Sequence, residues 1–208
     1  MRNAVRLIGL AGLVAGSVSC GDAVRSGSSP VYLVIDSLLG SRGGTTVGTP
    51  TSPVLSDVLT NVTSPLPCAP ATPCPTVFDD PGTATLRAPL KDIGVSGTLA
   101  PTTNNEVTIT RYRVDYIRAD GRNTPGVDVP YGFDGAVTGT ITPNSSRSFS
   151  FELVRHVAKK ESPLVQLVTS GNVITTIARV TFYGQDRTGN AVSVTGQIQV
   201  NFGNFGDF

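Results

Sequence analysis

The amino-acid sequence predicts an all-β protein, an antiparallel β-sandwich of about seven strands. Three observations lead to this prediction: apolar and polar residues alternate with a period of two from Thr83 onward, turn-forming Gly, Pro, Asn and Asp residues punctuate the chain, and no long segment has helical periodicity. Strands with one apolar face pack sheet against sheet, so each alternating segment should bury one side in a shared core.

The first nineteen residues have the composition of a secretory signal. Arg2 and Arg6 precede a short apolar run that ends in Gly16-Ser-Val-Ser-Cys20. The run is too short to span a bilayer as a helix, and the small residues at its end suit cleavage between Ser19 and Cys20. We therefore expect residues 1–19 to be removed on export.

The end of this segment resembles the signal of bacterial lipoproteins, in which a small residue precedes a cysteine that receives a diacylglycerol on its sulfur and an acyl chain on its new amino group. Ser17 stands where lipoproteins mostly have Leu, and an ordinary signal peptidase could cut the same bond. The resemblance implies lipidation at Cys20. It also implies a membrane-anchored protein of the bacterial cell envelope, on the periplasmic or cell-surface side.

The cysteine count supports both the anchor and a disulfide. The chain has three cysteines, and an odd number in an exported protein leaves one to explain. Cys68 and Cys74 flank a short, proline-rich loop and are expected to form a disulfide in an oxidising compartment, so Cys20 remains for lipidation. A zinc site is disfavoured because zinc takes four ligands and the only histidine, His156, lies far away in the sequence.

Composition and charge limit the partners. Residues 20–30 are rich in small residues and read as a flexible tether, and residues 31–208 have the size of a single domain. The formal net charge is +1. That balance argues against nucleic acid and against polybasic attachment to anionic lipid, so the expected membrane contact is the acyl anchor alone.

The first strand is predicted over residues 31–35, a β-branched and aromatic run. A long insertion rich in Pro, Gly and Thr follows over residues 40–76. Within it, apolar residues at 54, 55, 58, 59 and 62 fit a helix, while their β-branched content fits a strand. The sequence leaves that element undecided.

The remaining strands follow from alternation, and the clearest pair is a C-terminal hairpin. Residues 174–183 and 192–202 alternate on either side of the polar turn Gln185-Asp-Arg-Thr-Gly-Asn190. One further strand, residues 107–116, changes its parity. Val107 and Ile109 are apolar at odd positions, whereas Tyr112, Val114 and Tyr116 are apolar at even positions, which predicts a β-bulge near Thr110.

At this level the chain resembles bacterial immunoglobulin-like and fibronectin type III-like domains. The resemblance rests on Arg111-Tyr-Arg-Val-Asp-Tyr116 as a central strand and on the closing hairpin from Ala178 to Val194, without the paired core cysteines and tryptophan of antibody domains. It implies an immunoglobulin-like sandwich that serves as a spacer, an adhesion unit or a binding module, and the fold alone does not choose among these roles.

Catalytic and metal-binding motifs are sparse. His156 is the one imidazole and has charged neighbours, so we expect a surface histidine, no enzymatic activity and no cofactor. Asp79-Asp80 and the pair Asp186 and Asn190 offer oxygen atoms that suit either Ca²⁺ or an ordinary turn. The outward row Arg111, Arg113 and Asp115, together with Arg179 and Tyr183, suits either a ligand-binding face or a solvated sheet surface.

The functional expectation is therefore an exported, lipid-anchored structural or protein-interaction module, with other envelope proteins or further copies of the chain as candidate partners. The first alternative is a carbohydrate or small-ligand binding lipoprotein that uses the 40–76 loop. The second is a hydrolase built on carboxylates. At the C-terminus Phe202 is expected in the core, while Phe205 and Phe208 either tuck against the edge of the sandwich or dock onto a partner or a neighbouring copy.

Overall fold

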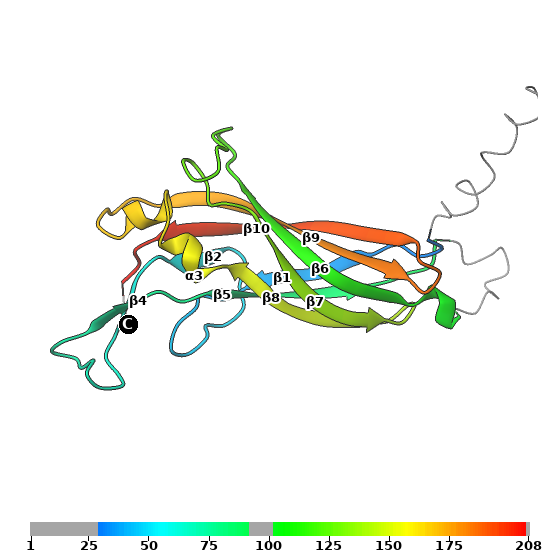
Figure 1. The fold of residues 1–208 in the computed structure, drawn as a ribbon, viewed down its shortest axis with the longest axis horizontal. Helices are drawn as coiled ribbons and strands as arrows, with labels where there is room; N and C mark the ends of the chain where they lie inside the picture. The colour runs from blue at the N-terminus through cyan, green and yellow to red at the C-terminus, as the bar shows by residue number, and fades with distance from the viewer. Residues whose placement is uncertain (1–28, 92–101, 207–208) are drawn as a thin grey trace, which may run out of the picture.

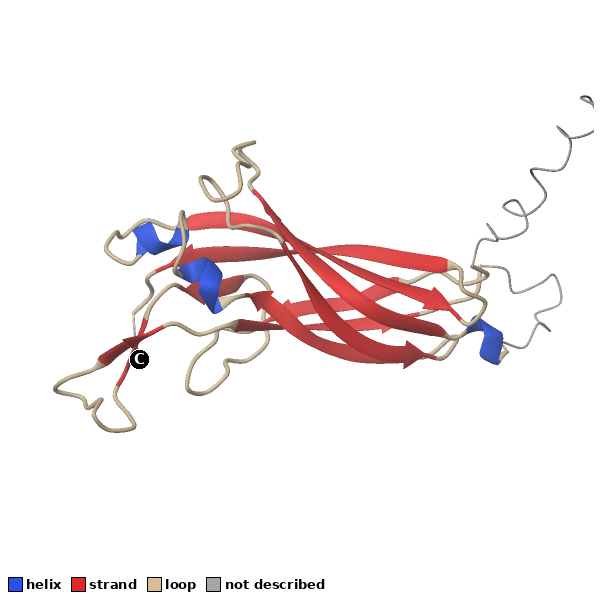
Figure 2. Ribbon diagram, in the orientation of Figure 1, coloured by secondary structure: helices blue, strands red, loops and turns tan. Residues whose placement is uncertain are grey.

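The computed structural model describes residues 29–91 and 102–206. The signal segment, Cys20, most of the tether and Phe208 lie outside the described residues, so the expectations placed on them remain predictions. The described chain is mostly β-structure, as Figure 2 shows. Its strands are β1 (Val34–Gly40), β2 (Val54–Asp57), β3 (Thr60–Val62), β4 (Cys74–Thr76), β5 (Asp80–Arg87), β6 (Val107–Ile117), β7 (Phe133–Ile141), β8 (Ser146–Val154), β9 (Ile174–Asp186) and β10 (Ala191–Gly203).

Helical structure is confined to short turns between strands. These are η1 (Thr103–Asn105), α3 (His156–Lys159) and η2 (Leu164–Leu167). Within the described ranges no helix is long and apolar enough to cross a membrane.

The two main sheets face each other across one apolar core (Figure 1). One sheet has the order β1-β5-β8 and the other has the order β2-β10-β9-β6-β7. Alternate residues of β5, β8, β9 and β10 point inward, as predicted. The centre of the core holds Tyr112, Phe151 and Phe182 with ring centroids 5.2 to 6.3 Å apart. Such aromatic groups bury large apolar areas, so they contribute strongly to the stability of the fold.

The sheets also touch along their margins, where glycine permits close approach. A Cβ atom on Gly196 of β10 would lie 2.7 Å from Ile35 and 3.0 Å from Leu38 of β1. The atoms that it would meet are the ends of the Ile35 and Leu38 side chains. The small size of Gly196 therefore lets these two side chains pack directly against β10.

The predicted hairpin and the predicted β-bulge are both confirmed. Strands β9 and β10 pair antiparallel over almost their full length. In β6 the register shifts between Ile109 and Arg111 against both neighbouring strands. Because of this shift the odd-numbered Val107 and the even-numbered Tyr112 both face the core, and both are buried.

Three local predictions are resolved or revised. The undecided segment 54–62 forms two strands, β2 and β3, of which β2 joins the five-stranded sheet in parallel with β10. Part of the predicted insertion thus belongs to the main fold. The first strand begins at Val34 rather than at Val31, because Val31 forms only an isolated bridge to Leu90.

The molecule is elongated, and its two ends differ (Figure 1). We call the end that holds Ser29 and the β9–β10 turn the proximal end, where Ser29 hydrogen-bonds Asp186. The distal end holds the β3–β4 hairpin, α3 and η2. Strand β10 runs from one end to the other, and its 13 residues correspond to about 40 Å at the usual rise per residue of a strand.

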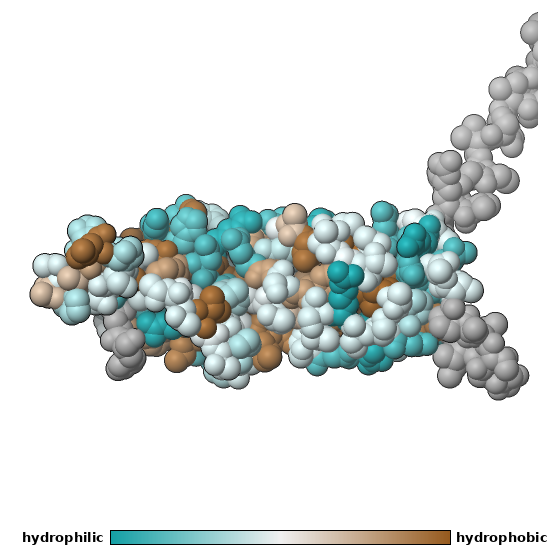
Figure 3. Space-filling view, turned by 90° about the horizontal axis from the view of Figure 1, so that it is seen from below, coloured by the Kyte–Doolittle hydropathy of each residue, from teal (hydrophilic) through white to brown (hydrophobic). Residues whose placement is uncertain are grey.

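Exposed apolar side chains are concentrated toward the distal end. Figure 3 shows several such side chains on the distal half of one face. Among the described residues, large and exposed hydrophobic side chains belong to Tyr32 toward the proximal end and to Val47, Leu55, Leu66, Val127, Tyr131, Val157, Val165 and Val173.

Candidate functional site

A groove of about 460 Å³ at the distal end is the candidate functional site. It opens between the loop that follows β1 and strand β3, within the segment expected to carry recognition. Its walls combine glycines, hydroxyl and amide groups and one guanidinium, without an aromatic ring. The lining residues are Arg42, Gly43, Gly44, Thr45, Thr46, Gly48, Thr60, Asn61, Val62, Thr63 and Ser64.

The first wall of the groove is the loop from Arg42 to Gly48, which backbone hydrogen bonds close and attach to Asp80. The N–H of Gly48 donates to the carbonyl of Arg42 at 3.1 Å, which closes the loop. The N–H of Gly43 donates to Oδ1 of Asp80 at 2.8 Å. A Cβ atom on Gly43 would lie only 1.9 Å from the carbonyl oxygen of Asp79, so this close approach requires glycine.

A buried ion pair lies beneath this wall. Lys159 Nζ donates to Oδ1 of Asp80 at 2.8 Å, and the exposed fractions of the two side chains are 1% and 0%. The hydroxyl of Ser56 donates to the other carboxylate oxygen. Burial raises the pKa of Asp80, while the Lys159 ammonium and the hydrogen bonds from Ser56 and Gly43 act in the opposite direction. Because Lys159 belongs to α3, Ser56 to β2 and Asp80 to β5, these contacts connect the three elements.

A second buried carboxylate, Asp57, connects both walls of the groove with the C-terminal segment. It accepts a hydrogen bond from the guanidinium of Arg42 and one from the hydroxyl of Thr60 at 3.2 Å. The backbone N–H of Phe205 donates to its other oxygen at 3.1 Å. Removing this carboxylate would therefore loosen three segments together.

His156 lies at the surface, as expected, and contacts Asp79. Its backbone N–H donates to Oδ1 of Asp79, and its ring Nδ1 lies 2.9 Å from the same oxygen. The exposed fraction of the His156 side chain is 46%. Partial burial acts to raise the pKa of Asp79, but the hydrogen bonds from His156 outweigh it and hold the pKa below its ordinary value. Asp79 thus contacts His156 at the start of α3, and its neighbour Asp80 contacts Lys159 at the end of α3.

The predicted disulfide between Cys68 and Cys74 is confirmed, with a Cα–Cα distance of 5.3 Å. It closes the loop that connects β3 and β4 at the distal end. The bridge therefore constrains the hairpin whose first strand forms the second wall of the groove.

The two aspartate-rich turns are occupied by protein donors. Asp80 contacts Lys159, Ser56 and Gly43, as described above. Asp186 accepts hydrogen bonds from the backbone and side chains of Thr188 and Asn190 at 2.7 to 3.0 Å. Burial acts to raise the pKa of Asp186, but these hydrogen bonds outweigh it and hold the pKa well below its ordinary value. Within residues 29–91 and 102–206, no three His, Cys, Asp or Glu side chains form a group that could hold a metal ion.

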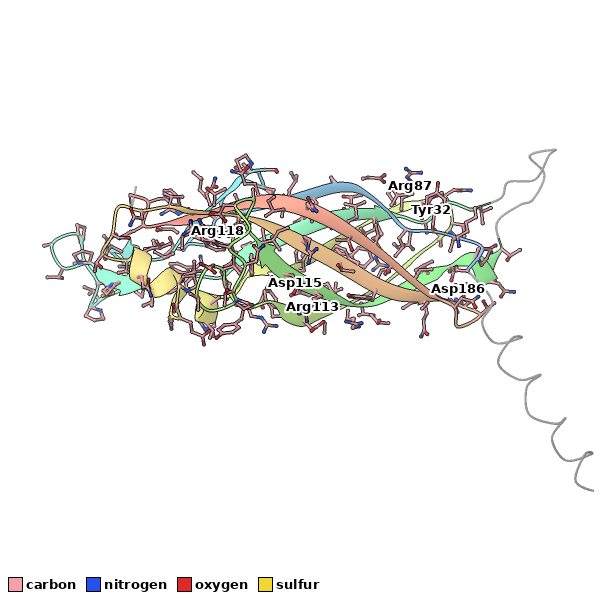
Figure 4. The ribbon with its side chains drawn as sticks, turned by 90° about the horizontal axis from the view of Figure 1, so that it is seen from above. Tyr32, Arg87, Arg113, Asp115, Arg118 and Asp186 are labelled. Atoms are coloured by element: carbon pink, nitrogen blue, oxygen red, sulfur yellow. A yellow bond between two sulfur atoms is a disulfide. The ribbon has the colours of Figure 1, made fainter. Side chains whose placement is uncertain are left out.

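In the outward row on the five-stranded sheet, Arg111, Arg113 and Asp115 belong to a network of paired charges, and Arg179 is exposed beside it. Arg113 contacts Asp115 and Asp134, both at 2.8 Å, and Arg111 contacts Asp134 at 3.1 Å. The Arg111 guanidinium lies 3.7 Å from the centre of the Tyr183 ring. Figure 4 shows Arg113 and Asp115 side by side on this face. Since the charges pair with one another, this face resembles a solvated sheet surface more than a binding site.

The C-terminal segment contacts its own domain. Phe202 is fully buried, as predicted. Phe205 is half-buried, and its N–H contacts Asp57, while the Asn204 side chain donates to the carbonyl of Val168 at 2.7 Å. Of the two predicted fates, packing against the edge of the domain is therefore the one observed for Phe205.

The sequence did not reveal the buried polar residues around the groove. Lys159 and Lys160 are neighbours, yet the first is buried and the second is exposed. Ser56 and Asp57 interrupt an apolar pattern and read as surface positions. Of the buried polar residues around the groove, the sequence singled out only Asp80, as part of Asp79-Asp80.

Comparisons with protein-family models, with curated proteins and with solved structures find no match to this chain, so its function has to be inferred from its own geometry.

Proposed function

We propose that this protein is an exported, lipid-anchored component of the bacterial cell envelope that acts as a structural or protein-interaction module. One observation carries the proposal: the described chain begins at the proximal end, while the groove, the disulfide hairpin and many exposed apolar side chains lie toward the distal end. An anchor at Cys20 would then hold the molecule by one end and present the other end to partners.

We further propose an immunoglobulin-like arrangement for the core of the module. Seven strands support it, with β1, β5 and β8 in one sheet and β10, β9, β6 and β7 in the other. The three remaining strands come from the 40–76 segment. Such sandwiches act as spacers and interaction units, which suits the elongated shape.

The anchor is tested by replacing Cys20 with Ser. We expect the Cys20→Ser variant to lose labelling by a radioactive fatty acid and to move from the membrane fraction to the soluble fraction, because no acyl chain can be attached. A variant with Cys68→Ser and Cys74→Ser keeps the anchoring cysteine and should remain in the membrane fraction. If the Cys20→Ser variant stays with the membrane, the anchor proposal is wrong.

Binding of a carbohydrate or another small ligand is the second candidate. The hydroxyl-rich lining of the groove favours it, but no aromatic ring among the lining residues offers a stacking surface for a sugar. We therefore rank it below the interaction module. A carboxylate hydrolase ranks third, because Asp57 and Asp80 are both buried and each contacts a basic side chain.

A further inference from the structure

Strand β10 has an open edge over most of its length. It pairs with β9 on one side, while on the other side β2 pairs only with its last residues, from Val200 to Gly203. Among the described residues, no strand and no isolated bridge pairs with this edge over residues 191–199. The consecutive residues 191–197 line two adjoining grooves of about 260 and 530 Å³. Since side chains of a strand alternate between its faces, such an unbroken run means that the backbone edge faces the opening.

Two hydrogen bonds show which backbone groups of β10 face this edge. At the turn, the N–H of Asp186 donates to the carbonyl of Asn190 at 3.0 Å, and the register continues along the hairpin without a shift. Even-numbered residues of β10 therefore exchange hydrogen bonds with β9. The carbonyl of the odd-numbered Gly203 accepts from the N–H of Val58, on the side of β2, at 3.0 Å. The open edge thus presents the N–H and C=O groups of residues 191, 193, 195, 197 and 199.

The opposite margin of the molecule is protected. Strand β7 pairs only with β6, but two arginines cover carbonyl groups of β7. Arg147 donates to the carbonyl of Thr140 at 3.0 Å, and Arg155 donates to that of Asp134 at 2.7 Å. Charged side chains at an edge keep it from pairing with another chain. Strand β10 lacks this protection, because its 13 residues include no charged residue and no proline.

The edge of β1 lies on the same margin as that of β10. Strand β1 is the outer strand of the three-stranded sheet, and its Ile35 and Leu38 lie against Gly196 of β10. The two strands run in the same direction, because residues 29–33 lie beside 191–193 and residues 32–38 lie beside 194–197. An added peptide strand would cover one edge only, whereas the same margin of a second copy contains both edges. A two-fold rotation that reverses β10 also reverses β1, so it sets both strands antiparallel to their copies.

We propose that two copies of this chain pair antiparallel through the open edge of β10, about a two-fold axis at Thr195. Thr195 is the midpoint of residues 191–199, so this register pairs the longest stretch. Ser193 then lies opposite Gln197 of the other copy, and uncharged hydroxyl and amide side chains meet across the axis without like-charge repulsion. Asp36, the one charged residue of β1, is compensated by Arg87 at 3.2 Å.

This inference goes beyond the anchored module and does not depend on the anchor. The two proximal ends lie at opposite ends of the pair. Two copies that stand upright on one membrane surface therefore cannot form it, whereas copies on facing surfaces can. We test the pairing on the full chain in detergent solution, where no membrane fixes the orientation, so its outcome is separate from that of the membrane fractionation above.

Sedimentation analysis over a range of concentrations tests the pairing. We expect a monomer–dimer equilibrium whose dissociation constant rises about tenfold in Thr195→Lys, because two lysines meet at the axis. Thr181→Lys is the matched control and should leave the constant nearly unchanged, because the Thr181 hydroxyl lies 2.9 Å from that of Thr195 but on β9, away from the edge. A mixture of Thr195→Lys and Thr195→Glu should associate again. A chain that stays monomeric, equal effects of the two lysines, or no association in the mixture would each overturn the proposal.

Cysteine cross-linking tests the register. In a hydrogen-bonded antiparallel pair the Cα atoms lie about 5.5 Å apart, which is within reach of a disulfide. We therefore expect Thr195→Cys to form a disulfide-linked dimer under mild oxidation. Thr181→Cys, three strand spacings or about 14 Å from its copy, should not. Equal cross-linking of the two variants would mean that the copies meet through another surface, which would overturn pairing at β10.

Discussion

Lys159 and Lys160 show how strongly location decides the role of one residue type. The first forms the buried pair with Asp80, and the second is exposed. Replacing Lys159 with Met leaves a carboxylate buried without its counter-ion, which typically costs about 3 kcal/mol or more. We therefore expect Lys159→Met to lower the urea midpoint of unfolding strongly, while Lys160→Met leaves it nearly unchanged. Equal midpoints for the two variants would contradict a stabilising role for the pair.

Asp186 gives a prediction about pH. Its folded-state pKa is lowered, so its charged form stabilises the fold above the unfolded-state pKa of about 3.9, and this contribution disappears as the pH falls below that value. We expect Asp186→Asn to be less stable than the parent at pH 7, with the difference in free energy of unfolding shrinking below about pH 4. Glu161→Gln, at an exposed carboxylate, is the control. A difference that stays constant with pH would refute this account.

At the residue level, alternation in the sequence identified most inward-facing apolar positions, including Phe202. It could not identify Ser56, Asp57 or Lys159 as buried, because their burial depends on partners from distant segments. A polar side chain is buried at low cost only where a hydrogen-bond partner lies beside it in the folded protein. A single sequence does not show which residues from distant segments become such partners.

At the scale of elements, the β-bulge in β6 was predictable, whereas β2 and β3 were not. The change of parity between Ile109 and Tyr112 has one simple structural solution, an extra residue. The pattern over residues 54–62 fits helix and strand equally well. Only the pairing of β2 with β10 and of β3 with β4 decides between them, and such tertiary pairing overrides local propensity.

The disulfide-closed hairpin gives a prediction for one element. The double variant Cys68→Ser and Cys74→Ser removes a constraint on the unfolded chain, so we expect the free energy of unfolding to fall by about 2 kcal/mol. Chemical denaturation of the parent under non-reducing conditions gives the reference value. An unchanged free energy would show that β3 and β4 unfold independently of the main sheets.

At the scale of the whole molecule, the sequence predicted an all-β chain with sheets but not the difference between its two ends. That difference arises because the 40–76 segment, α3 and η2 gather at one end, although they lie far apart in the sequence (Figure 1). The order of strands along the chain does not contain this information, since β5 pairs with β1 and β8 rather than with its neighbours in the sequence.

The proposed orientation can be measured in a lipid-anchored preparation. Asn104, in η1 at the proximal end, and Gly171, at the distal end, are exposed positions suited to a single labelled cysteine. A fluorophore at Asn104→Cys should be quenched more by spin-labelled lipid than one at Gly171→Cys, because the two ends lie about 40 Å apart along β10. Equal quenching would mean that the molecule lies flat on the membrane.

The parallel pairing of β2 with β10 also constrains how the protein can be made. Val54 pairs with Val200, so the five-stranded sheet stays incomplete until residue 200 has been synthesised. Pairings between such distant residues form slowly because a long loop must close first. Under the proposed export, a transporter that threads the chain from its N-terminus would therefore receive a polypeptide whose five-stranded sheet has not yet formed.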